Sequence, residues 1–183
     1  MSLTVVGGLP AHVLFVHFVV VLVPLTALAL VAGAIWPGAA RRMGIVLPLL
    51  ALVTLASVPL ATHAGEWLEA HVGSDALVRR HAELGDGLLP WAGGLFVLAA
   101  VLWWTTRRAA NGAGTTGAGT AGAGTASVPA RYSLPLRVVT AVLCVGVAAG
   151  AVVDVYRIGD SGAKAAWQHG YSKTAVVDRT GNG

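Results

Sequence analysis

Four long apolar runs constrain what this chain can fold into more than any other feature. Three of them contain no Asp, Glu, Lys or Arg: residues 13–35, 44–62 and 88–106. A fourth uncharged run, 138–153, reaches a similar length if its helix begins near Leu134 and Arg137 extends to the interface. About 20 apolar residues in a helix cross a bilayer, and in lipid an isolated segment must satisfy its own backbone. The sequence therefore predicts an all-α, polytopic membrane protein with a four-transmembrane-helix bundle.

Composition also favours the lipid bilayer over water as the main solvent. Hydrophobic residues make up 56% of the 183 residues and charged residues only 11%, whereas about a quarter of a soluble domain is charged. The net charge is +4, but no basic cluster alternates with aromatic residues, so nucleic-acid binding is not expected. Cys144 is the only cysteine, which excludes an internal disulfide and a Cys-x-x-Cys-His haem attachment.

The arginines predict the orientation of the bundle. Arg41 and Arg42 follow the first run, Arg107, Arg108 and Arg131 follow the third, and neither link contains an acidic residue. Short arginine-bearing loops stay in the cytoplasm. We therefore expect a multi-pass protein of the cytoplasmic (plasma) membrane, with both termini and the 63–87 link on the extracytoplasmic side.

The chain is expected to form a single domain over residues 1–183, interrupted by one linker. Residues 109–130 are rich in Gly, Ala and Thr. This composition is typical of a flexible, disordered tether because it offers nothing to bury. We expect this linker on the cytoplasmic side.

All six histidines fall on the side predicted to be extracytoplasmic: His12, His17, His63, His71, His81 and His169. His12 and His17 are five residues apart, so on a helix they point about 140° away from each other. His17 is the one expected within the bilayer. It either faces the bundle interior as a functional group or donates a hydrogen bond to a backbone carbonyl or a hydroxyl as a neutral ring.

Two further motifs place histidines beside carboxylates or glycines. "THAGEWLEAH" puts His63 and Glu66 on one helical face, a spacing that suits a metal ligand set and is also common on exposed surfaces. "RRHAELGDG" puts His81 on a helix that leads into the third span.

In the tail, Gly159 and Gly162 bracket Asp160 and Ser161 and predict a turn. A short extracytoplasmic amphipathic helix from Gly162 to Gln168 would follow it, and His169 would either fold back over the bundle or lie in solvent.

Four motifs, taken in order, resemble one known family. They are "GLPAHVLFVHF" followed by Pro24, "HAGEWL", "RHAELGD" and "GDSGAKAAW". Together they resemble the predicted bacterial membrane proteins of domain of unknown function family 2231, over nearly the whole chain except the linker and the last few residues. That family commonly has His-Pro and His-Phe-Pro where this chain has His-Val and His-Phe-Val. The resemblance implies four helices in the cytoplasmic membrane, and it implies topology rather than a mechanism.

Three hypotheses account for the histidines. In the first, a haem b near the outer face uses His17 and His81 as axial ligands, with His12 and His63 as alternates, and the protein passes electrons. In the second, zinc or copper binds at the same mouth, with ligands from His12, His63, Glu66, His81 and His169.

In the third hypothesis, the protein is a non-catalytic accessory or assembly subunit that contacts membrane-protein partners. The histidines are then hydrogen-bonding elements. The chain shows no nucleophile–base arrangement and no phosphate-binding glycine-rich loop with a lysine, so enzymatic turnover is not expected.

Overall fold

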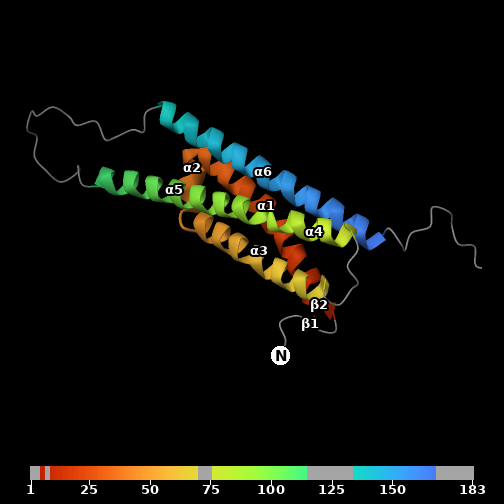
Figure 1. Cartoon of the computed structure of the whole chain (residues 1–183). Coiled ribbons are helices and arrows are strands. Elements are labelled where there is room, and N and C mark those ends of the chain that lie inside the picture. Colours follow the sequence, from red (N-terminus) through yellow and green to blue (C-terminus); the bar gives the residue numbers. More distant parts are fainter. Residues whose placement is uncertain (1–4, 7–8, 70–75, 115–133, 168–183) are drawn as a thin grey trace, which may run out of the picture.

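The computed structural model describes residues 5–6, 9–69, 76–114 and 134–167. The helices are α1 (Ala11–Ile35), α2 (Pro37–Met43), α3 (Val46–Glu69), α4 (Ala76–Asp86), α5 (Leu88–Gly114) and α6 (Leu134–Trp167). Two short strands, β1 (Val5–Val6) and β2 (Leu9–Pro10), pair antiparallel just before α1. Figure 1 shows the long helices lying along one common direction, with α2 toward one end of the bundle and α4 toward the other.

Four helical segments of the described chain are long and apolar enough to cross a membrane. They are Ala11–Ile35, Val46–Leu68, Ala76–Asn111 and Pro135–Trp167, so the third runs through both α4 and α5. This result confirms the predicted four-span helical class. Large apolar side chains point outward from the spans, among them Val21, Leu28 and Val142. Such a surface suits contact with lipid chains rather than water.

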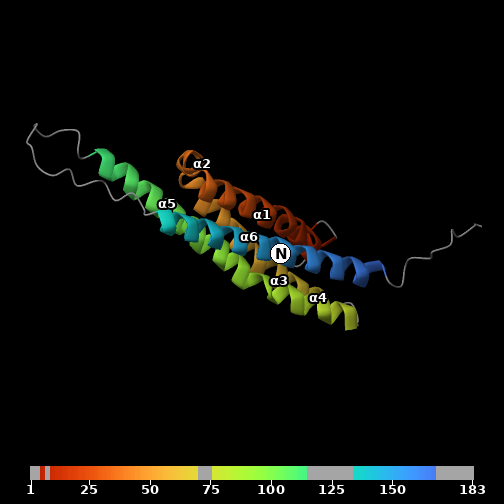
Figure 2. The same ribbon diagram turned by 90° about the horizontal axis from the view of Figure 1, so that it is seen from above.

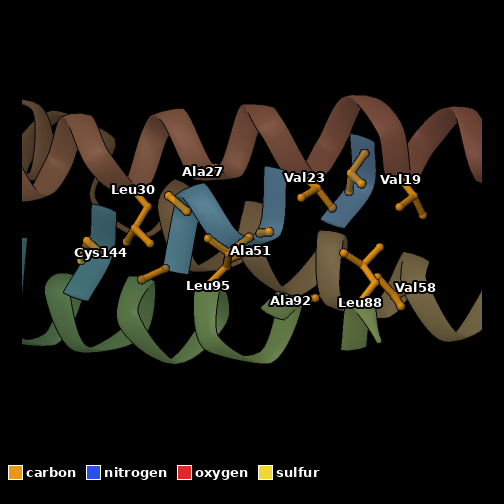
Figure 3. Packing of buried hydrophobic residues seen from close by; sticks show 14 of the residues in the cluster. Val19, Val23, Ala27, Leu30, Ala51, Val58, Leu88, Ala92, Leu95 and Cys144 are labelled. Carbon is orange, nitrogen blue, oxygen red and sulfur yellow. The ribbon is translucent and has the colours of Figure 1, made fainter. Parts of the chain in front are cut away.

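The core is apolar and is built largely from small side chains. α1 packs against α3 and α6, while α5 packs against the same two helices. Val23 and Leu30 of α1 point into this core together with Leu95 of α5, and all three are fully buried (Figure 3). Buried alanines from four helices lie among the larger core side chains and let the backbones approach closely: Ala27, Ala51, Ala61, Ala92, Ala99, Ala148 and Ala151.

One polar contact crosses the middle of this core. The hydroxyls of Thr26 in α1 and Thr54 in α3 are 2.7 Å apart, and both residues are fully buried. Thr54 also donates to the carbonyl of Leu50 at 2.9 Å, so the hydroxyl of Thr26 is the donor between the two helices. Hydrogen bonds of this kind between hydroxyls help to hold membrane helices together.

The tail of the bundle differs from the prediction. The expected turn at Asp160 and Ser161 and the separate helix from Gly162 to Gln168 are wrong, because α6 continues without a break to Trp167. An ion pair of 2.6 Å between Lys164 and Asp160, one turn apart, supports the helix here. α4 packs along this part of α6, and that burial outweighs the roughly 1 kcal/mol that each interior glycine costs a helix. Figures 1 and 2 both show α6 as one long helix beside α4 and α5.

Two links also carry more helix than expected. α5 runs on to Gly114, so the first residues of the predicted 109–130 linker are helical, and residues 115–133 lie outside the described part of the chain. The link with Arg41 and Arg42 forms α2, which begins with Pro37 in its first turn. Proline suits that position because its missing N–H would have no partner there.

Candidate functional site

His12 lies in the first turn of α1 and faces α3. Its Nδ1 atom is 2.9 Å from the carbonyl oxygen of Ala61. One turn further along α3, Gly65 touches the ring, since a Cβ built there would lie 3.0 Å from Cε1 of His12. The absence of a side chain at Gly65 therefore lets α3 approach the imidazole directly.

His81 lies on α4 and is held in the same way by α6. Its Nδ1 atom is 3.1 Å from the carbonyl oxygen of Ile158 and 3.0 Å from the hydroxyl of Ser161. That hydroxyl is buried and donates to the Ile158 carbonyl at 2.8 Å. A Cβ at Gly162 would lie 2.9 Å from Cε1 of His81, so a second glycine admits the second ring.

The two imidazoles meet each other between the helices. Their ring centroids are 6.2 Å apart and their planes are inclined by 87°. His12 and His81 are called the histidine pair below. The pair brings together the start of α1, the second half of α3, α4, and the last turns of α6. It lies toward the end of the bundle that is remote from α2 (Figure 1).

The hydrogen bonds define which ring nitrogen is free. A backbone carbonyl only accepts, so Nδ1 of each ring must be the donor to Ala61 or Ile158. In the neutral imidazole the other nitrogen, Nε2, then carries a lone pair. The site therefore offers two Nε2 lone pairs on neighbouring, oriented rings, which is what a metal ion or a hydrogen-bond donor requires.

His17 does not join the pair. Its side chain is exposed on α1, and Nδ1 is 2.5 Å from the carbonyl oxygen of Val13 on the same helix. The expected His17–His81 axial pair is therefore not formed. The reason is helical geometry: His12 faces α3, and a residue five positions later points away from that face. The contact with Val13 matches the second of the two readings of His17.

His63 and Glu66 also lie away from the pair. Nδ1 of His63 is 3.5 Å from a carboxylate oxygen of Glu66, and the two side chains are 86% and 72% exposed. His169 falls outside the described residues. Among the described residues of the predicted metal set, His12 lies beside His81 and His63 lies beside Glu66, as two separate pairs. Within the described part of the chain no three His, Cys, Asp or Glu side chains converge on a point that could hold a metal ion.

A half-buried carboxylate on α6 is a further polar feature of this region. Oδ2 of Asp154 is buried, and within the described residues it has no hydrogen-bond partner. It faces the junction of α4 and α5, since a Cβ at Gly87 would lie 3.8 Å from it. Asp154, Ile158 and Ser161 are spaced so that they share one face of α6.

Several parts of this site had no usable sequence signal. Ala61 and Ile158 contribute carbonyl oxygens, which every residue has, so only the packing of the helices selects them. Ser161, Gly65 and Gly162 stand in the motifs "HAGEWL" and "GDSGAKAAW". The motifs mark the region, but the contacts of these residues with the rings follow from the tertiary structure.

Fold and site together define a helical membrane protein with an oriented pair of imidazoles held between its helices. Residues 8–175 match the family described as predicted membrane protein (DUF2231). The chain belongs to this family, which confirms the resemblance of its motifs. No curated protein and no solved structure matches the chain.

Proposed function

We propose that this protein binds a haem b between His12 and His81 and transfers electrons in the membrane. The observation that carries the proposal is the geometry of the histidine pair. Both rings are anchored through Nδ1, so the two Nε2 atoms would be the nitrogens that hold the iron. The observed separation of the centroids is 6.2 Å.

The anchoring of both rings supports the same reading. A metal-bound histidine almost always donates its second ring N–H to a carbonyl or carboxylate, which fixes the tautomer and the orientation. Both members of the pair have this second contact, at 2.9 Å to Ala61 and 3.1 Å to Ile158. His17 also donates to a carbonyl, but it has no facing imidazole within the described structure. It is the combination of anchored rings with a facing partner that distinguishes the pair.

The number of protein ligands favours haem over zinc or copper. A zinc site takes three or four ligands from the protein. Haem iron needs at most two, because the porphyrin supplies the other four. Two imidazoles from facing helices would thus be enough to hold a haem, and four-helix bundles build cofactor sites in this way.

Each part of the chain then has a defined task. His12 and His81 would hold the iron, which supplies one-electron redox chemistry when haem is bound. Ala61, Ile158 and Ser161 orient the rings, and the apolar helices exclude water from them. From the placement of the arginines we expect the site near the extracytoplasmic face, where it would exchange electrons with a partner on that side.

The test is an absorption spectrum of purified protein, oxidised and reduced, after expression with sufficient haem precursor. We expect a Soret band and, in the reduced form, the separate α and β bands of a low-spin haem iron. His12→Ala and His81→Ala should each either abolish this spectrum or convert it to that of a five-coordinate haem. In the second case, added imidazole should restore the six-coordinate spectrum.

His17→Ala and His63→Ala are the matched controls, since both remove an exposed histidine and should leave the spectrum unchanged. Protein that stays colourless after haem supplementation would reject the proposal. Stoichiometric copper or zinc that depends on His12 and His81 would assign the pair to a bare metal. If the protein binds neither haem nor metal, the accessory-subunit hypothesis remains, with the histidine pair as a packing element.

A further inference from the structure

A shallow basic groove lies at the end of the bundle opposite the histidine pair. It has a volume of 530 Å³ and is lined by Gly38, Ala39, Arg41 and Arg42 of α2. No atom lies within 4 Å of the position that a Cβ of Gly38 would take, so the groove is open beside this residue. Ala40 is buried against the bundle and fixes the helix, while both arginines are exposed.

Two more arginines lie on α5, which packs against α2. The guanidinium of Arg107 is 5.4 Å from the ring centroid of Trp103, and that of Arg108 is 4.7 Å from the ring centroid of Trp104. These cation–π contacts keep the charges near the indoles, a residue type that gathers at the headgroup level of membranes. Trp36, which precedes α2, is also exposed and adds an indole beside the groove.

The positive charge of these four arginines is not balanced by acidic residues in the neighbouring segments of the chain. No Asp or Glu occurs before residue 66 or between residues 87 and 153, so α1, α2 and α5 contain no acidic residue at all. Within the described structure the two ion pairs, His63–Glu66 and Lys164–Asp160, do not involve these arginines. Four guanidinium groups at one bundle end are therefore left for an external anion.

From this geometry we infer that the groove on α2 binds the headgroup of an anionic phospholipid. A guanidinium donates two parallel hydrogen bonds to phosphate oxygens, which lysine cannot reproduce. Neighbouring indoles gather at the depth where lipid phosphates lie, and basic pockets beside spans bind such headgroups. The inference is independent of haem binding, because no residue of the histidine pair takes part.

The experiment measures lipid retention by native mass spectrometry of the full chain, extracted from nanodiscs of phosphatidylglycerol and phosphatidylcholine in equal amounts. We expect wild type to retain phosphatidylglycerol. The double variant Arg41→Gln with Arg42→Gln should lose about tenfold or more of this retention, since each basic residue near an anionic surface contributes about fivefold. Arg41→Lys with Arg42→Lys should fall in between.

Arg79→Gln with Arg80→Gln is the matched control, because it removes two exposed arginines from α4 at the other end. It should retain lipid as wild type does. Equal loss in the control, or equal retention of phosphatidylcholine, would overturn the inference. Displacement of the lipid by millimolar inorganic phosphate would overturn it too, because the groove would then bind free phosphate. Gel filtration of each variant verifies that the bundle is intact.

Discussion

His12 at the start of α1 and His81 on α4 face each other with their ring centroids 6.2 Å apart. Each ring rests against a glycine of a different helix, Gly65 of α3 or Gly162 of α6. The pair is thus enclosed by backbone on two sides. This arrangement makes the glycines as important to the site as the histidines.

Gly162→Ala should disturb the site, whereas Gly159→Ala should not. The new Cβ at position 162 would lie 2.9 Å from His81, and such overpacking typically costs about 1–3 kcal/mol. At position 159 nothing lies within 4 Å, so the alanine should be neutral or stabilise α6 by up to about 1 kcal/mol. Thermal unfolding in detergent measures both, and equal effects of the two variants would contradict the packing described.

The neutral forms of His12 and His81 should carry their proton on Nδ1. The reason is that a carbonyl oxygen, which only accepts, lies 2.9 Å from Nδ1 of His12 and 3.1 Å from Nδ1 of His81. Solid-state or solution NMR of protein with ¹⁵N-labelled imidazoles distinguishes the two tautomers, and His12→Ala and His81→Ala assign the signals. A proton found on Nε2 of either ring would show that its anchor to the backbone is not made.

Removing the hydroxyl contact between α1 and α3 should weaken the bundle. Thr26→Val and Thr54→Val each delete one partner of a buried 2.7 Å contact, and interhelical hydrogen bonds in membranes average about 0.6 kcal/mol, with a maximum near 2 kcal/mol. A double-mutant cycle in a reversible unfolding assay should give a coupling in this range. Thr140→Val is the control, because that hydroxyl bonds only to Leu136 of its own helix. No coupling between Thr26 and Thr54 would disprove the link.

Gly150→Ala should separate α5 from α6. A Cβ at this position would overlap the indole of Trp91, so the ring or the helix must move, at a cost of about 1–3 kcal/mol or more. Gly146→Ala lies one turn earlier on α6, where nothing is within 4 Å, and should be tolerated. Unfolding midpoints and the emission of Trp91 report the difference. An unchanged emission in Gly150→Ala would mean that the indole does not seat on this glycine.

The spans could be predicted because hydropathy is a property of consecutive residues. Residues 13–35 contain no formal charge, and α1 covers all of them. The same holds for the run at 88–106, because α5 begins at Leu88 and runs past the end of this segment. Local signals failed where packing outweighs them. Glycines near residue 160 suggested a turn, but contact with α4 and the Lys164–Asp160 pair keep α6 helical to Trp167.

By itself, the sequence determined that this chain is helical, that it crosses a membrane, and that His12 and His17 point in different directions from one helix. These results need only the residues of one segment and the geometry of a helix. Only the tertiary structure decided which histidine meets His81, because that depends on how α1 is rotated about its axis against α3 and α6. The rotation is set by the summed packing of many small apolar side chains, and no short motif records it.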